Sequence, residues 1–366
     1  MNLKNINKLE VYYKNELVGH LIDNGNLTHS FTYCDEWLNN GFSISPFKLP
    51  LEPRVFVCND YLIQSMFGVF YDSLPDSWGN KLIDSYLSNK GINLSNVTLL
   101  QRLALLDKYS LGALSYKPSL KDNFELSDSD EYDEIYNGIE KFLKNDSDID
   151  FDLYHYGSST GGSRPKINKF INGDLYIVKF PSHLDPLDIG ESEYKLNLLA
   201  KECGLNVPDC LLLPSKKTKG YFATKRFDYD RGNKKHVISL AGLFDLNPSL
   251  SQIHYLGFLQ TVRALCPEDL IEAVKRMIFN YLIGNKDDHP RNFSFIYDEE
   301  SKSYRLSPFY DITSTPNIKE HMMQVNDKDE PELEDFVIEA SKVGVDKKIV
   351  VEIYSFLSKK VKNFNK

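Results

Sequence analysis

The chain has few cysteines and no long apolar run, and each shortage excludes a class of protein. Its five cysteines are odd in number and scattered without a Cys-x-x-Cys pair, so neither a disulfide framework nor a zinc site is indicated. No apolar stretch is long enough to cross a bilayer, and the residues after Met1 are polar rather than a secretory core. We therefore expect a cytoplasmic protein without membrane contact.

Basic residues are also in the minority. The sequence has 43 Lys and Arg against 52 Asp and Glu, a net charge of −9. A strong nucleic-acid binder needs a basic surface, so any contact with DNA is expected only indirectly, through a basic partner. The composition is that of an ordinary globular protein, and 366 residues suffice for two or more compact parts.

The most informative stretch runs from Gly284 to Phe293. Upstream of it, apolar residues recur at helical spacing from Pro267, and Gly284 is a typical helix stop. Downstream, residues 293–297 alternate like a strand, and residues 304–306 return it as a hairpin. The polar loop between helix and hairpin carries the carboxylate of Asp287 and, five residues later, the amide of Asn292.

Phosphoryl transfer from ATP needs these groups. An Asp on a rigid loop accepts the proton of the attacking hydroxyl, and an Asn further along reaches a metal ion. A second Asp after the hairpin joins that metal to the phosphates, and Asp311 is placed for it. The alternative is that Asp287, Asp288 and Asn292 only cap a turn.

A glycine-rich run at residues 157–166 precedes a strand at 175–180 that carries Lys179 among apolar residues. Glycines let backbone N–H groups approach phosphates, and kinases place a phosphate-binding lysine on the next strand. A flexible turn and an edge-strand lysine are the plain alternatives. Glu191 and Glu193 begin the following helix, where they either pair with Lys179 or simply suit the helix N-terminus.

The remaining chain divides by pattern. Residues 1–110 read as a small α+β domain without a catalytic constellation, in which Trp78 is a core aromatic. Residues 111–152 read as an acidic, solvated connector with a helical patch at 135–143. Residues 153–228 form a sheet-containing part that ends in Lys225 to Phe227, candidates for holding adenine. Residues 229–366 form a helical lobe that contains the catalytic loop.

Six motifs in this order resemble those of HipA-type serine/threonine kinases, the toxins of bacterial HipBA toxin–antitoxin systems. The N-terminal stretch with Ser73-Leu74-Pro75-Asp76-Ser77-Trp78-Gly79 is similar to the small domain that precedes the kinase in that family. The motifs are Ser159-Thr160-Gly161-Gly162-Ser163-Arg164-Pro165-Lys166, Ile177-Val178-Lys179-Phe180-Pro181, Leu199-Ala200-Lys201-Glu202-Cys203-Gly204-Leu205, Arg226-Phe227-Asp228, Gly284-Asn285-Lys286-Asp287-Asp288-His289-Pro290-Arg291-Asn292-Phe293 and Pro308-Phe309-Tyr310-Asp311.

The resemblance implies an α+β, bilobal protein-kinase-like fold, with ATP and Mg²⁺ as cofactors. It implies Asp287 as catalytic base, Asn292 and Asp311 as Mg²⁺ ligands, and Lys179 on the nucleotide phosphates. It also implies autophosphorylation at Ser159, with Ser158 and Thr160 close enough to leave that position open. The implied ATP site further contains Gly161, Gly162, Ser163, Arg164, Pro165, Lys166, Lys225, Arg226, Phe227, His289, Pro290, Arg291 and Tyr310.

Two departures from the family pattern bear on these implications. Lys225 stands where family members often have a glutamate, with little expected consequence because backbone groups usually hold adenine. The C-terminal lobe is short and lacks evident basic segments, so direct DNA contact is not expected.

The leading hypothesis is thus a toxin kinase that phosphorylates a Ser or Thr of a cellular protein. The resemblance implies targets in the translation machinery, aminoacyl-tRNA synthetases among them, and a DNA-binding, HipB-like antitoxin as partner. Two alternatives stay open: an ATP-binding regulatory module without turnover, and a kinase for small molecules or lipids.

Overall fold

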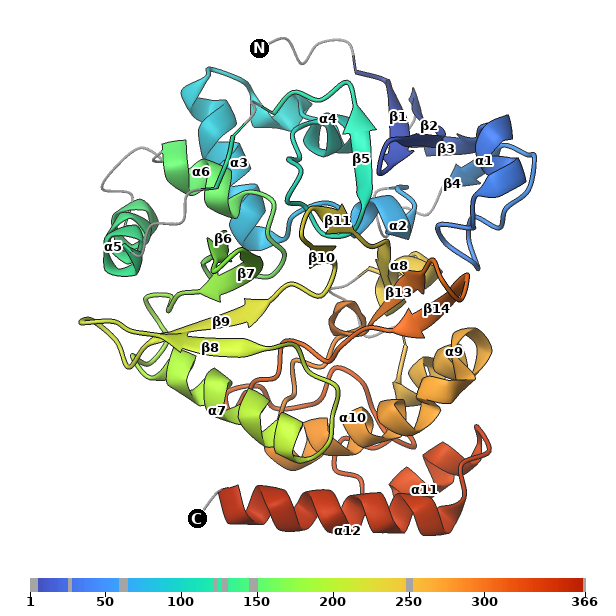
Figure 1. Ribbon diagram of the computed structural model, residues 1–366, viewed down its shortest axis with the longest axis vertical. Coiled ribbons are helices and arrows are strands. Elements are labelled where there is room, and N and C mark those ends of the chain that lie inside the picture. The colour runs from blue at the N-terminus through green and yellow to red at the C-terminus, as the bar shows by residue number, and fades with distance from the viewer. Residues whose placement is uncertain are drawn as a thin grey trace. The chain divides into compact units, whose positions relative to one another are not determined.

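A computed structural model describes residues 6–25, 28–58, 65–121, 124–126, 131–144, 151–247 and 253–364. The chain divides into two compact units, whose elements are labelled in Figure 1. Unit 1 contains Met1–Glu191, Leu211–Ile238 and Gly242–Asp245, and unit 2 contains Ser192–Cys210, Ser239–Ala241 and Leu246–Lys366. Among the described helices, none is long and apolar enough to cross a membrane.

The first part of unit 1 is a five-stranded antiparallel sheet in the order β4-β3-β2-β1-β5. Its strands alternate buried and exposed side chains, so one face covers a core. The strands are β1 (Lys8–Tyr13), β2 (Glu16–Gly25), β3 (Thr28–Tyr33), β4 (Phe56–Cys58) and β5 (Leu114–Lys117). The helices beside them are α1 (Asp35–Asn40), α2 (Gly68–Tyr71), α3 (Ser77–Asn89), η2 (Leu94–Asn96) and α4 (Leu99–Ala104).

The second part of unit 1 is a four-stranded sheet in the order β6-β7-β9-β8. The strands are β6 (Lys166–Ile171), β7 (Asp174–Lys179), β8 (Cys210–Leu213) and β9 (Tyr221–Lys225), with a small β10 (Tyr229–Asp230) and β11 (Asn233–Lys234) hairpin after them. The helices α5 (Tyr132–Leu143) and α6 (Phe151–Gly157) precede it. Residues 237–244, where the chain passes between the units, form β12 (Val237–Ser239) and α8 (Leu240–Phe244).

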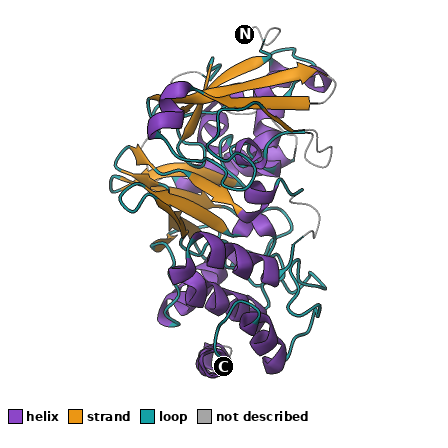
Figure 2. Ribbon diagram, turned by 90° about the vertical axis from the view of Figure 1, so that its right-hand side faces the viewer, coloured by secondary structure: helices purple, strands orange, loops and turns teal. Residues whose placement is uncertain are grey.

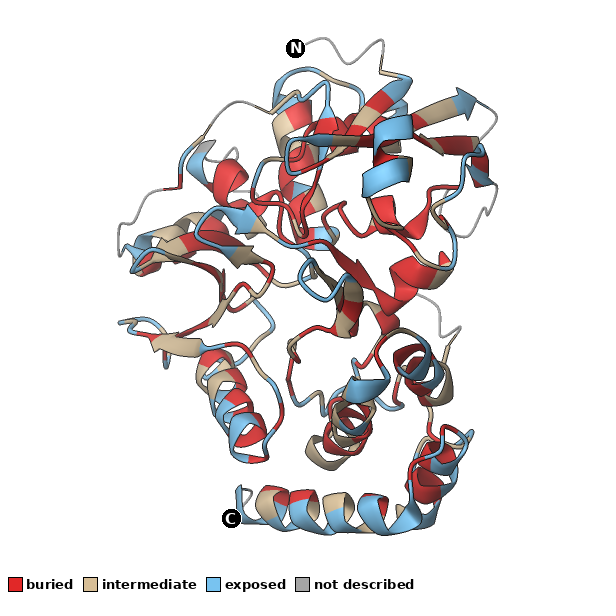
Figure 3. Cartoon of the chain, turned by 45° about the vertical axis from the view of Figure 1, so that its right-hand side comes forward, coloured by how far each residue is buried: buried red, intermediate tan, exposed pale blue. Residues whose placement is uncertain are grey.

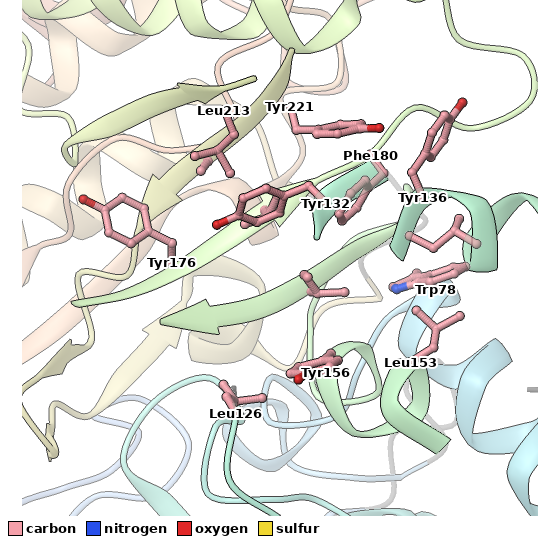
Figure 4. Close-up of a cluster of buried hydrophobic side chains, with 14 of the residues drawn as sticks. Trp78, Leu126, Tyr132, Tyr136, Leu153, Tyr156, Tyr176, Phe180, Leu213 and Tyr221 are labelled. Carbon is pink, nitrogen blue, oxygen red and sulfur yellow. The ribbon is translucent and has the colours of Figure 1, made fainter. Parts of the chain in front are cut away.

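One aromatic core joins the helices of unit 1 to this second sheet. Figure 4 shows Trp78 of α3 and Tyr136 of α5 in the same cluster as Phe180 and Tyr221 from the sheet side. The rings of Tyr136 and Phe180 stack at 6.2 Å, and those of Phe180 and Tyr221 lie 4.8 Å apart. Trp78 is therefore a core aromatic, as predicted.

Unit 2 is mainly helical toward its C-terminal end (Figure 2). Its elements are α7 (Ile189–Glu202, which starts in unit 1), α9 (Tyr255–Leu265), η3 (Pro267–Asp269), α10 (Leu270–Ile283), η4 (Pro290–Asn292), β13 (Ser294–Asp298), β14 (Ser303–Leu306), α11 (Leu333–Ser341) and α12 (Lys347–Phe364). The helix α12 packs on α10 and α11. It has a buried and an exposed side in Figure 3, and its buried residues are Val350, Leu357 and Val361.

One expectation about unit 1 is wrong. The stretch 111–152 was expected to be a solvated connector, but β5 pairs with β1 and α5 buries Tyr136, Ile139 and Phe142. The acidic composition of this stretch gave no indication of these long-range contacts. The most acidic runs, 127–130 and 145–148, lie outside the described residues.

Candidate functional site

The predicted catalytic loop starts where α10 ends. Gly284 adopts the left-handed conformation, with φ of 68°, and its amide closes the helix on the Tyr281 carbonyl. The Gly284 carbonyl then accepts the amide of Thr315, whose hydroxyl oxygen accepts the amide of Lys286 at 2.7 Å. The loop is thus fixed at its first residues by a segment that follows Asp311.

The two adjacent aspartates of this loop have opposite environments. Asp287 is exposed, whereas Asp288 has no exposed surface. Both carboxylate oxygens of Asp288 accept hydrogen bonds, from the Tyr255 hydroxyl at 2.7 Å and from the Met322 amide at 2.9 Å among others. A substrate hydroxyl can therefore reach Asp287 but not Asp288.

The next residues of the loop continue this arrangement. His289 is half-buried and precedes η4, in which Pro290 and Asn292 are buried. The side-chain amide nitrogen of Asn292 donates a hydrogen bond to the backbone carbonyl of Asp287 at 2.8 Å. This bond fixes which way the Asn292 amide is turned and leaves its oxygen as the group that can act as a ligand.

Asp311 lies beside this loop within unit 2. The hydroxyl of Tyr310 donates to the Arg291 carbonyl at 2.6 Å, so the residues that precede the two predicted ligands touch each other. Asp311 has φ of 58°, a conformation that non-glycine residues seldom adopt and that clusters at functional sites. The structure thus joins the segments of Asp287, Asn292 and Asp311.

The side chain of Arg276 and one backbone hydrogen bond hold the segment before Asp311. The guanidinium of Arg276, which is almost fully buried, donates to the Ser307 carbonyl at 2.8 Å and lies 5.3 Å from the Phe309 ring. Burial lowers the pKa of Arg276, and Glu272, which accepts from it at 3.0 Å, acts in the opposite direction. The Phe309 amide donates to the Asn206 carbonyl at 2.7 Å.

The oxygen groups of this region suit a hard cation. Asn and Asp oxygens are ligands that Mg²⁺ accepts, and it usually takes one or two carboxylates besides phosphate oxygens and water. Among the described residues no group of three or more His, Cys, Asp or Glu is placed to hold a metal ion.

The glycine-rich loop lies in unit 1 and is held by the start of α3. The amide of Gly162 donates to the Asp76 carboxylate at 2.6 Å, and the Gly162 carbonyl accepts the amide of Trp78 at 3.3 Å. The Trp78 ring nitrogen donates to the Lys166 carbonyl at 2.8 Å. Gly162 has φ of 91°, and a side chain there would meet the Lys166 ammonium, so only glycine fits.

The other residues of this loop are placed as follows. Gly161 and Ser163 are exposed. Arg164 forms an ion pair of 3.1 Å with Asp185, and the carbonyl of buried Pro165 accepts the amide of Phe180 at 2.9 Å.

The three candidate hydroxyls for autophosphorylation are all buried. Ser158, Ser159 and Thr160 are exposed by 1%, 5% and 2%. The Ser158 hydroxyl oxygen accepts from the ammonium of Lys121, and Thr160 donates to the Gly157 carbonyl at 2.7 Å. The loop must move before any of the three can receive a phosphate.

Lys179 ends β7 and pairs with Lys166 on one side and Phe222 on the other. Its ammonium lies 5.6 Å from the Phe222 ring. Lys179 and the glycine-rich loop belong to unit 1, whereas Asp287, Asn292 and Asp311 belong to unit 2.

The predicted adenine-binding residues differ in their side chains. Lys225 forms an ion pair of 2.7 Å with Asp174, and Phe227 is half-buried. The guanidinium of Arg226 is buried and binds Asp228, with distances of 2.9 and 2.6 Å. It also donates to the Asn168 side chain at 3.0 Å, so the Arg226 side chain has a structural role inside unit 1.

Sequence reasoning missed Tyr255, His321 and the part that Asp288 plays. His321 lies in a polar stretch without helical or strand periodicity, and Tyr255 is one aromatic among many. The one signal for Asp288 was its place beside Asp287, and that signal also fits a turn cap.

Two protein families and several known proteins are similar to this chain. Residues 9–117 match the HipA N-terminal domain family, and residues 158–363 match the HipA-like C-terminal domain family. The serine/threonine-protein kinase toxin HipA of Shewanella oneidensis is 24% identical over 355 residues, 87% of this chain and 77% of that protein. A candidate kinase of Haemophilus influenzae is 29% identical over 183 residues, 43% of this chain and 53% of that protein. The chain thus spans only about half the length of some relatives that it matches.

A solved structure gives the same result for the fold. The structure of the Shewanella oneidensis toxin–antitoxin system HipA, HipB and its operator DNA contains a chain that is 20% identical, with a TM-score of 0.71. The match covers 97% of this chain and 89% of that one, which confirms the predicted HipA-like α+β fold. Because the C-terminal family match alone covers more than half of the chain, the protein belongs to the HipA family.

Proposed function

We propose that this HipA-family chain is an Mg²⁺- and ATP-dependent serine/threonine protein kinase that acts as the toxin of a toxin–antitoxin system. The observation that carries the proposal is the arrangement in unit 2. An exposed Asp287 shares a loop with Asn292, and the contact of Tyr310 with Arg291 brings the Asp311 segment beside that loop.

Each group then has a defined task. Asp287 accepts the proton of the attacking Ser or Thr hydroxyl. Asn292 and Asp311 would hold Mg²⁺, which when bound neutralises phosphate charge. In unit 1, Lys179 and the backbone N–H groups of Gly161 to Arg164 bind the phosphates, with Pro165 and Lys166 closing that loop, while Lys225, Arg226 and Phe227 hold adenine through their backbone. In unit 2, the proposed nucleotide contacts are His289 to Arg291 and Tyr310.

The decisive test is phosphate transfer by purified protein incubated with Mg²⁺ and ATP. Intact mass should increase by one phosphate that maps to Ser159, with Ser158 and Thr160 as the neighbouring candidates. Asp287→Asn should abolish this gain and the growth arrest that expression causes. Glu300→Gln, which changes an exposed carboxylate of the same unit, should alter neither. Unchanged labelling in Asp287→Asn would overturn the proposal.

The same experiment separates the alternatives. ATP binding without any mass increase or transfer indicates a regulatory module. Transfer to a small molecule or lipid, with none to protein, indicates the second alternative. A phosphoproteomic comparison of cells expressing wild type or Asp287→Asn identifies the target, for which an aminoacyl-tRNA synthetase is one candidate.

A HipB-like antitoxin is the partner that we propose. The solved relative was determined with HipB and operator DNA, and the net charge of −9 here argues that DNA contact comes through such a partner. Co-expression with a neighbouring antitoxin gene should relieve growth arrest and yield a complex.

A further inference from the structure

Both oxygens of the Asp288 carboxylate accept hydrogen bonds. One of its oxygens accepts the Tyr255 hydroxyl at 2.7 Å and the Nδ1 group of His321 at 2.9 Å. The other accepts the backbone amides of Met322 at 2.9 Å and Met323 at 3.4 Å. With no exposed surface, this carboxylate is stabilised by these protein donors in place of bulk water.

A chain of buried amides runs from the same tyrosine toward Asp311. The Tyr255 hydroxyl accepts the Asn280 side-chain amide at 3.0 Å. The oxygen of that amide accepts the Asn285 side chain at 2.9 Å, and Asn285 also lies 3.4 Å from the Asp311 carbonyl. Bonds in such a network orient one another, so the position of Asp288 bears on the backbone of Asp311.

Two tyrosines remain protonated donors in this network. Burial, reinforced by the charge of Asp288, raises the pKa of Tyr255 and of Tyr281. Tyr281 does not bond Asp288. Its ring stacks on that of His321 at 3.7 Å, and its hydroxyl donates to the Met323 carbonyl at 3.0 Å.

We propose that Asp288 is a positioning residue of the kinase centre. Its buried carboxylate joins the catalytic loop to residues 321–323 and, through Tyr255, Asn280 and Asn285, to the backbone of Asp311. It thereby fixes Asp287 and Asp311 relative to each other. This inference rests on the proposed kinase function.

The geometry explains why an aspartate is needed here. The segment from Ile312 to Val325 has no described helix or strand to hold it, apart from the isolated bridge of Val325 with Lys328. Asp288 and the backbone of Lys286 supply the acceptors and donors that fix it. An asparagine at position 288 would keep one acceptor oxygen but turn its NH2 group toward the donors on the other side, so it cannot reproduce the bonds of Asp288.

The test compares four variants of the full chain. Tyr255→Phe and His321→Ala each remove one donor to Asp288. His321→Asn is the conservative variant, because an asparagine amide nitrogen can take the place of Nδ1. Tyr281→Phe is the matched control, since Tyr281 is a half-buried tyrosine of the same cluster whose hydroxyl donates to the Met323 carbonyl and not to Asp288.

We expect Tyr255→Phe and His321→Ala to lower kcat for phosphate transfer by about tenfold to a hundredfold, as for a misplaced catalytic group, with KM for ATP changed less than about threefold. His321→Asn should recover most of kcat, and Tyr281→Phe should stay within about twofold of wild type. Wild-type kcat in both donor variants would overturn the proposal.

Amide hydrogen exchange gives a readout that needs no activity. Loss of a donor should speed exchange at Met322 and across residues 284–292 and 311–325, and leave α12 unchanged. If wild type transfers no phosphate, the proposed function fails, yet this local pattern still decides whether Asp288 joins these segments. Exchange that is unchanged, or raised evenly over unit 2, would contradict the inference.

Discussion

The carboxylate of Asp76 accepts a hydrogen bond of 2.6 Å from the backbone amide of Gly162. It joins the domain that carries the Ser73 to Gly79 motif to the glycine-rich loop. Backbone amides of such loops are the groups that bind phosphates, so Asp76 occupies a donor that a nucleotide would otherwise use. The small domain therefore contacts the predicted nucleotide loop directly.

Gly79→Ala should release this loop. A Cβ at position 79 would lie 2.5 Å from the Pro75 Cβ, 2.8 Å from the Ser158 carbonyl oxygen and 3.1 Å from that of Thr160. We expect a loss of roughly 1–3 kcal/mol in unfolding free energy, as for other overpacked sites. Hydrogen exchange at residues 158–163 should rise several-fold.

The control for this change is Gly138→Ala in α5. Beyond its own helix backbone and chain neighbours, a Cβ at position 138 would meet no heavy atom of the described residues within 4 Å, so the variant should be as stable as wild type or slightly more stable. If Gly79→Ala leaves exchange in the loop unchanged, α3 does not hold the loop in solution.

Local patterns made the helices and hairpins predictable. The stop at Gly284 and the hairpin after Phe293 both depend on residues close in sequence, and both are confirmed. The pairing of β5 with β1 was not predicted, since a strand of four residues has little periodicity and its partner is far away in the sequence.

The same reason explains why the role of Asp288 in the candidate site was not predicted. Asp287 and Asn292 stand out because their spacing fits a known chemistry. Asp288 is equally acidic, and only its contacts with Tyr255 and His321 distinguish a buried acceptor from a base. Partners from distant segments cannot be inferred from the loop alone.

Replacing Asp288 should destabilise the protein more than replacing the adjacent Asp287. Asp288→Asn replaces a buried acceptor of several donors and should lower the unfolding free energy by roughly 2–4 kcal/mol. Asp287→Asn changes an exposed side chain and should lower it by less than about 0.5 kcal/mol. Urea unfolding of the two variants measures this difference, and equal midpoints would show that Asp288 is not buried as described.

Arg226→Lys should destabilise unit 1. The planar guanidinium binds Asp228 with two nitrogens and also reaches the Asn168 side chain, which a single ammonium cannot reproduce. We expect a loss of roughly 3 kcal/mol because the Asp228 carboxylate stays buried and poorly paired. The neighbouring Lys225→Gln removes a partly exposed ion pair with Asp174 and should cost less than about 1 kcal/mol. Similar losses in both variants, measured by thermal unfolding, would contradict this account.

His236 should make unit 1 sensitive to acid. Its ring is fully buried and donates through Nε2 to the Ile44 carbonyl at 2.8 Å, and burial lowers its pKa from 6.5 to about 4. In the unfolded chain the ring takes a proton first as the pH falls below 6.5, so stability from this group is present above that pH and is lost between 6.5 and 4. The difference between these pKa values corresponds to about 3 kcal/mol.

His236→Gln keeps a donor for Ile44 but does not titrate. The unfolding free energy of wild type minus that of this variant should therefore fall by up to that amount between pH 7 and pH 4, as urea unfolding measures. If the difference in unfolding free energy between wild type and variant stays constant over this range, His236 is accessible to protons in the folded protein.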